Sequence, residues 1–163
     1  MIETKEQIQA RVDRAVELFK SGYNCSQAVV TAFADGYGYT EEQALRMAAS
    51  FGGGIGRMRQ TCGAACGLFM LAGLETGATQ ASDRAGKSAN YALVQDLAAQ
   101  FKELNGSTIC ADLLGLTNGL HNDPQAAERT ATYYKKRPCV KMVESAAQLW
   151  ADYLLQKEEC KEV

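Results

Sequence analysis

Four of the six cysteines in this chain stand where the local sequence predicts the start of a helix: Cys25, Cys62, Cys110 and Cys139. Each follows a residue type that favours helix N-termini, namely Asn24, Thr61, Ser107-Thr108 or Pro138. A helix N-terminus carries about half a positive charge and unpaired N–H groups, which favour thiolate over thiol. Thiolates attack disulfides and bind metals, so the four sulfurs are candidates for one redox or metal site.

Basic residues near two of these cysteines strengthen the prediction of ionised sulfur. Arg57 and Arg59 precede Cys62, and a Lys-Lys-Arg run precedes Pro138 and Cys139. Nearby cations lower the pKa of a thiol, and Cys62 is expected to be the most reactive. The alternatives are that each cysteine is a small buried hydrophobe and that the basic run is a solvated helix end.

The spacing of the cysteines excludes the commonest motifs. No Cys-x-x-Cys pair occurs, which disfavours zinc ribbons and thioredoxin-like sites. Cys62 and Cys66 are four residues apart and share one face of a helix, where they could share a metal but would form a poor disulfide. Cys160 lies in a polar tail and is interpreted as incidental.

A glycine-rich stretch, Gly52-Gly53-Gly54-Ile55-Gly56, precedes the central cysteines. It matches no nucleotide-binding fingerprint and is expected to let the backbone pass close to the helix that begins at residue 62. Its N–H groups could also serve a thiolate or a cluster sulfide. The single histidine, His121, is expected to lie in a surface turn.

The elements that must position these residues are helical throughout. Capping residues and apolar periodicity predict helices, and no strand alternation of useful length occurs. The chain is therefore predicted to be all-α, with residues 1–163 forming a single-domain helical bundle of about five to seven helices. The predicted helical segments are 4–20, 25–34, 40–50, 62–75, 83–104, 108–115, 123–134 and 138–156.

Composition narrows the class of protein. The chain has 163 residues, 47% hydrophobic and 22% charged, with a net charge of −2, which fits one globular domain and no nucleic-acid or anionic-membrane partner. The polar first residues predict no secretory leader, and no apolar run is long enough to span a membrane, so a cytoplasmic location is expected. In a reducing cytosol, six cysteines favour metal ligands or redox thiols over structural disulfides.

The run Cys62-Gly63-Ala64-Ala65-Cys66-Gly67 fits the pattern CGAxxG, with Cys25 upstream and Cys110 and Cys139 downstream. The chain thereby resembles, over about residues 10–155, a redox-active protein family defined by C…CGAxxG…C…C, whose members are small helical proteins common in anaerobic microbes. The resemblance implies that Cys25, Cys62, Cys110 and Cys139 are the catalytic or metal-binding residues, with Gly63, Ala64 and Gly67 as cofactor-binding positions. Gly63 and Gly67 are also expected to allow close packing of a buried helix. Cys66 fills a variable position of the pattern, and Cys160 lies outside it.

The family resembles a domain of the split-Soret cytochromes, which implies an iron–sulfur cluster as one cofactor. No Cys-x-x-Cys-His sequence is present, so no haem is implied.

Two redox mechanisms stay open, a thiol/disulfide couple and an iron–sulfur electron carrier. The chain would then be an oxidoreductase or an electron-transfer protein whose redox partner is unidentified. One alternative is a structural zinc site, which is less favoured, and another is a helical interaction module with incidental thiols. The apolar helix at 62–75 could be covered within a monomer or across a homodimer.

Overall fold

The computed structural model describes residues 3–116 and 123–161, and within these ranges the chain is all-α, as predicted. The described part contains eight α-helices, one for each of the eight predicted segments and one more than the upper end of the expected total. Two 3₁₀ turns, η1 (Ala34–Tyr37) and η2 (Ala49–Phe51), follow α2 and α3. The helices are α1 (Lys5–Lys20), α2 (Cys25–Phe33), α3 (Glu41–Ala48), α4 (Gly63–Thr76), α5 (Arg84–Asn105), α6 (Cys110–Leu113), α7 (Ala131–Lys136) and α8 (Cys139–Lys161).

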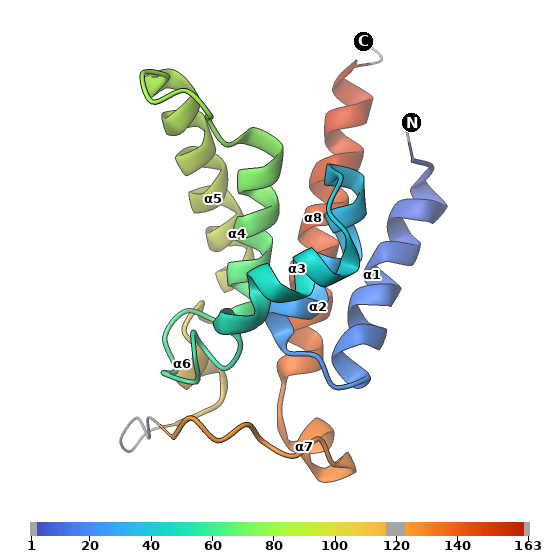
Figure 1. The fold of residues 1–163 in the computed structure, drawn as a ribbon, viewed down its shortest axis with the longest axis vertical. Coiled ribbons are helices and arrows are strands. Elements are labelled where there is room, and N and C mark those ends of the chain that lie inside the picture. The colour runs from blue at the N-terminus through green and yellow to red at the C-terminus, as the bar shows by residue number, and fades with distance from the viewer. Residues whose placement is uncertain (1–2, 117–122, 162–163) are drawn as a thin grey trace.

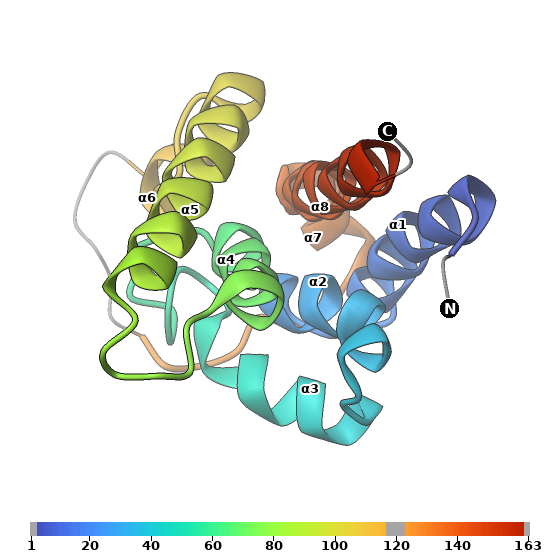
Figure 2. The same ribbon diagram turned by 90° about the horizontal axis from the view of Figure 1, so that it is seen from above.

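The bundle is built around α2, α4 and α8 (Figure 1). Helix α1 packs against α2 and α8, α4 packs against α2, α5 and α8, and α3 covers the outer side of α2. Seen from above, α8 lies beside α1, and α5 forms the opposite side of the molecule (Figure 2). In Figure 1 the N-terminal ends of α2, α4 and α8 point to the lower end of the bundle, where α6 also lies.

One apolar core joins these helices. It includes Trp150 and Val143 of α8, Leu97 and Phe101 of α5, and Phe19 of α1, all buried. The residues of α5 and α8 belong to apolar stripes that the spacing predicts, namely Val94, Leu97, Phe101 and Leu104 in α5 and Val140, Val143, Ala147, Trp150 and Leu154 in α8. Val94, Val140 and Leu154 are half-buried. Leu104 is 53% exposed, because it lies in the last turn before Gly106 ends the helix in the left-handed conformation.

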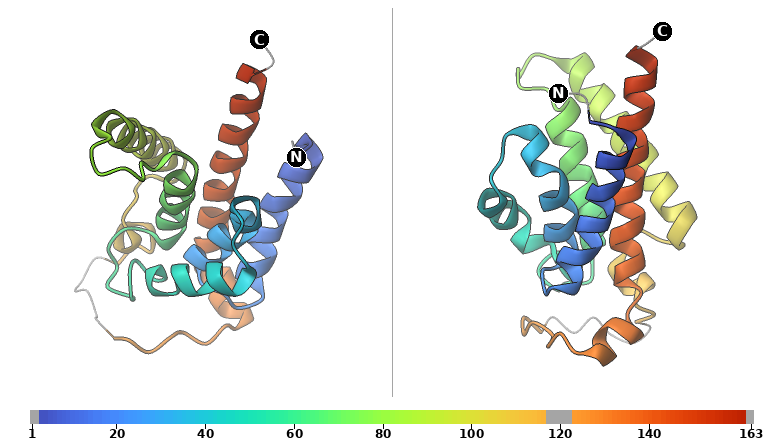
Figure 3. Two further views of the ribbon diagram at one scale, coloured as in Figure 1. Left: turned by 45° about the horizontal axis from the view of Figure 1, so that its top comes forward. Right: turned by 90° about the vertical axis from the view of Figure 1, so that its right-hand side faces the viewer.

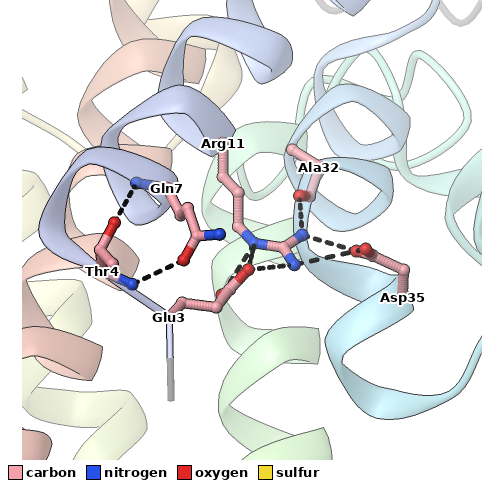
Figure 4. A network of polar contacts seen from close by, with 6 residues as sticks. All are labelled: Glu3, Thr4, Gln7, Arg11, Ala32 and Asp35. Carbon is pink, nitrogen blue, oxygen red and sulfur yellow. Dashed lines mark hydrogen bonds and ion pairs between the residues drawn. The ribbon is translucent and has the colours of Figure 1, made fainter. Parts of the chain in front are cut away.

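Capping residues set the helix starts at α1, α2 and α3. Each of these helices has a full capping box, in which an N-cap side chain and the glutamine three residues later bond each other's backbone N–H groups. Arg11 then ties α1 to the end of α2, because its guanidinium donates to Glu3, to Asp35 and to the carbonyl of Ala32 (Figure 4).

The prediction of a helix over 123–134 is wrong for its first part. Residues 123–130 have no regular structure, and α7 begins only after Thr130, whose hydroxyl accepts from the Tyr133 N–H. The Asp123 carboxylate instead accepts from the Gln125 N–H, which forms a local turn in place of a helix cap. Figure 3 shows this segment and α7 running below the lower ends of α1 and α8.

Two other expectations concern segments elsewhere in the chain. None of the described helices combines the length and the apolarity that a membrane span requires. His121 lies outside the described residues, so its expected surface turn stays a prediction.

Candidate functional site

The four motif cysteines line one cavity at the lower end of the bundle. Cys25, Cys110 and Cys139 are the first residues of α2, α6 and α8, and Cys62 is the N-cap of α4. The cavity has a volume of about 40 Å³ and is also lined by apolar side chains, among them Phe19, Leu113, Leu114 and Met142. Cys66 and Cys160 are not part of its lining; Cys66 is buried nearby and Cys160 is exposed.

Hydrogen bonds around Asn24 fix the position of Cys25. The Asn24 side chain accepts from the Gln27 N–H and donates to the carbonyl of Ala49, which joins the start of α2 to the end of α3. The Gln27 amide donates to the carbonyl of Leu45. The first turn of α2 is therefore anchored by the side chains of Asn24 and Gln27, and Cys25 between them is held against the glycine-rich loop.

A short backbone bridge brings Cys62 and Cys110 together. Thr61 and Ile109 form an antiparallel β-bridge just before the two cysteines. The Cys62 N–H donates to the carbonyl of Thr108 at 2.7 Å, and the Cys110 N–H donates to the carbonyl of Gln60 at 2.7 Å. These bonds place the start of α6 beside the start of α4, although the two cysteines are far apart in the sequence.

Gly63 allows the sulfur of Cys25 to reach the start of α4. A β-carbon at position 63 would overlap the Cys25 Sγ and would lie 2.7 Å from the carbonyl oxygen of Phe51. Real β-carbons essentially never approach other heavy atoms so closely. Only glycine therefore permits this contact between Cys25 and the residue that follows Cys62.

Of the three candidate cofactor-binding positions, Gly63 alone lines the cavity. Gly67 lies one turn further along α4, where a β-carbon would be 2.9 Å from the Val29 Cβ, so this glycine allows α2 and α4 to pack closely. Ala64 is fully buried in the core. Its N–H group and that of Ala65 lie near the Cys62 sulfur and lower the pKa of that thiol, but by less than burial raises it.

The glycine-rich loop wraps around the cavity in an unusual backbone conformation. Ile55, Arg57 and Arg59 have φ values of 66°, 61° and 61°, in the left-handed region that non-glycine residues rarely adopt. A β-carbon at Gly54 would lie 2.5 Å from the Cys110 Cβ, so the loop backbone passes directly over this cysteine. The Gly53 N–H lies against the Cys25 sulfur and lowers the pKa of that thiol. The expectation that loop N–H groups could serve a sulfur is met at this position.

The expectation of lowered thiol pKa values is wrong for the protein with free thiols. Burial raises the pKa of Cys139 to about 11 and that of Cys66 to about 11. It also raises the pKa of Cys25 and of Cys62, and the Cys25 sulfur close to Cys62 adds to the effect there. The favourable charge of helix N-termini and arginines is therefore smaller than the cost of removing a thiolate from water.

Among the residues that the structure describes, three arginines, Arg59, Arg129 and Arg137, line the cavity together with the cysteines, and no Asp or Glu does. Arg59 is only 7% exposed, and its Nη1 donates to the Cys110 Sγ at 3.8 Å. Sequence reasoning missed Arg129, because the segment before α7 was expected to be helical. No local motif marks this arginine.

A single metal ion does not fit the side chains as they stand. Across residues 3–116 and 123–161, no three His, Cys, Asp or Glu side chains form a group that could hold one. The donor set itself is four cysteine sulfurs, with no carboxylate of the described residues in the same cavity, and both iron–sulfur clusters and structural zinc sites use four cysteines.

The all-α bundle and the small cavity lined by four cysteines place this protein among helical proteins with a cysteine-lined site. The chain belongs to the family described as "Putative redox-active protein (C_GCAxxG_C_C)", whose model matches residues 23–153. The family label writes the central motif with glycine before cysteine, whereas this chain reads Cys62-Gly63-Ala64. No curated protein and no solved structure matches the chain.

Proposed function

We propose that this protein is a redox protein in which Cys25, Cys62, Cys110 and Cys139 form one redox centre. The observation that carries the proposal is the common cavity: four cysteines from four different elements line it, and no carboxylate of residues 3–116 or 123–161 does. The family, described by redox activity, supports the same role. Incidental thiols would have no reason to share one small buried space.

The first mode of action is a thiol/disulfide couple. Oxidation of two cavity thiols to one disulfide releases two electrons and two protons to the partner. Because burial raises the pKa of Cys25, Cys62 and Cys139, the resting form at neutral pH is the thiol. A partner must therefore reach the cavity and accept protons as well as electrons.

An iron–sulfur cluster is the second mode, supported by the all-sulfur donor set and by the positive charge of the buried Arg59 beside Cys110. Cys25, Cys62, Cys110 and Cys139 would hold the cluster, and the cavity of about 40 Å³ would have to widen to admit it. The cluster would supply single-electron transfer when bound. The protein contributes the four sulfurs, the Gly53 N–H directed at Cys25 and a largely apolar lining that limits water.

The test is anaerobic purification followed by iron, zinc, acid-labile sulfide and free-thiol analysis, with one cycle of oxidation and reduction. A thiol/disulfide couple would show no stoichiometric iron and a reversible loss of two thiols per disulfide formed. A cluster would show iron with matching sulfide. Stoichiometric zinc with no redox change, or no reversible redox change at all, would contradict the proposal.

A further inference from the structure

A groove next to the cysteine cavity continues its positive lining toward solvent. This groove has a volume of about 520 Å³ and shares Arg59, Arg129, Arg137 and Tyr133 with the cavity. It adds Arg57 to the lining, and none of the Asp or Glu side chains in the described part of the chain lines it. Four arginines therefore line the groove and the adjoining cavity, between the protein surface and the thiols.

Most of this positive charge has no protein counter-ion. Within the described residues, Arg57 alone of the four lies near a carboxylate, that of Asp123 at 3.9 Å. The Nη1 atom of Arg129 is buried without a hydrogen-bond partner, although its Nη2 donates to the carbonyl of Tyr23. Arg59 is nearly fully buried, and its one side-chain bond goes to the Cys110 sulfur. A charge held away from water is costly unless an anion compensates it.

Aromatic packing holds two of these arginines at the mouth of the cavity. The guanidinium carbons of Arg129 and Arg137 lie 4.6 Å and 4.8 Å from the centre of the Tyr133 ring. Arg129 also lies 4.8 Å from the centre of the Phe19 ring. Because the rings fix these side chains in the free protein, a ligand would meet preorganised charges.

The volumes of the cavity and the groove indicate that a ligand binds in the groove and reacts at the cavity. The cavity, at about 40 Å³, has room for only about three water molecules. The groove, at about 520 Å³, falls within the ~300–1,000 Å³ range of small-molecule sites. A ligand would therefore occupy the groove and present only its reactive end to the sulfurs.

We infer that the groove binds a small anionic molecule, with carboxylate or phosphate groups held by Arg57, Arg129 and Arg137, and delivers it to the thiols. The ligand class is thus an anionic redox substrate and not a neutral or cationic one. The delivery step rests on the proposed function, whereas anion binding stands on the charges and volumes alone.

Titration calorimetry of the purified protein with inorganic pyrophosphate tests the binding step. Saturable binding is expected, weakened at least about tenfold (about 1.4 kcal/mol) by Arg129→Gln or Arg137→Gln, because each variant loses a charge-assisted hydrogen bond to the anion. Arg137→Lys keeps the charge and should retain most of the affinity. Arg84→Gln removes an exposed arginine at the start of α5 and should change nothing. No saturable binding, or equal affinity in all variants, would overturn the inference.

Disulfide probes of different charge test the delivery step on protein with free thiols. A protein thiolate attacks the probe, the probe S–S bond breaks and one probe thiolate leaves. A second protein thiolate then displaces the other half, so two protein thiols are oxidised as one probe disulfide is reduced to two thiols. For each probe, the rate of reaction with the protein is divided by its rate with a free neutral thiol. The corrected rate of the anionic dithiobis(nitrobenzoate) should be at least about tenfold higher than that of the cationic cystamine, and this ratio should fall as the salt concentration rises.

Pyrophosphate binding and disulfide reduction, taken together, distinguish a failure of this inference from a failure of the proposed function. Reversible thiol oxidation with no charge preference, and no pyrophosphate binding, would overturn the anionic groove and leave the redox centre standing. Pyrophosphate binding that depends on Arg129 and Arg137, in a protein without reversible redox change, would overturn the redox centre and leave the groove standing.

Discussion

Gly63→Ala is the substitution that tests the close approach of α2 and α4 at the cysteine cavity most sharply. The added β-carbon would overlap the Cys25 Sγ, lie 2.7 Å from the Phe51 carbonyl oxygen and lie 3.4 Å from the Gly52 Cα. Relief requires the Cys25 side chain and the loop backbone to move. Such overpacking typically costs about 1–3 kcal/mol.

Gly73→Ala is the matched control, because it makes the same change in the same helix, where a β-carbon meets nothing within 4 Å. Replacing glycine by alanine there should stabilise the protein by about 0.4–1 kcal/mol. The free energies of unfolding of the two variants, measured by urea denaturation of the reduced protein, should therefore differ by about 1.5–4 kcal/mol in favour of Gly73→Ala. Gly63→Ala at least as stable as Gly73→Ala would refute the assigned contact between Gly63 and Cys25.

Three further predictions concern protonation and exposure. The reduced, metal-free protein should lose stability above about pH 8.5. The reason is that burial raises the pKa of Cys139 to about 11 in the folded protein, so the thiol of the unfolded chain ionises first. Urea unfolding at pH 7 and pH 10 should show this loss of stability, and Cys139→Ser should make the loss smaller. Arg11 lowers the pKa of Asp35, so this pair stabilises the fold above about pH 4, and the stabilisation is lost as the pH falls through the lowered value. Asp35→Asn should destabilise the protein by less than about 1 kcal/mol at pH 6 and by a smaller amount at pH 2, and equal effects at both pH values would contradict this. Iodoacetamide at pH 7.5 should modify the exposed Cys160 first, with peptide mass spectrometry as the readout; first labelling of Cys62 would show that ionisation and not exposure governs reactivity.

Local signals in the sequence suffice for most of the helices, but not for residues 123–130. Asn24 and Gln27 form a capping box, so the start of α2 at Cys25 can be read from four consecutive residues. The apolar stripe of α8 likewise predicts the burial of Val143, Ala147 and Trp150.

The electrostatics of the site depend on contacts between distant segments and cannot be read locally. The sequence predicts lowered thiol pKa values from neighbouring charges, but desolvation depends on how deeply α2, α4, α6 and α8 enclose each sulfur. Arg129 enters the cavity lining only because residues 123–130 run as irregular chain under the bundle. The reason for Gly63 is the sulfur of Cys25, which belongs to a different helix.

The central claim is that four cysteines form one redox centre, and a reductive titration of single Cys→Ser variants under anaerobic conditions tests it most directly. Cys160→Ser is the control, since Cys160 is exposed and lies outside the cavity lining. The account predicts that the number of electrons taken up per chain is unchanged in Cys160→Ser and is reduced, or its midpoint potential shifted, in each of the variants Cys25→Ser, Cys62→Ser, Cys110→Ser and Cys139→Ser. Titrations of these four variants that match the parent protein in both electron count and potential would contradict it.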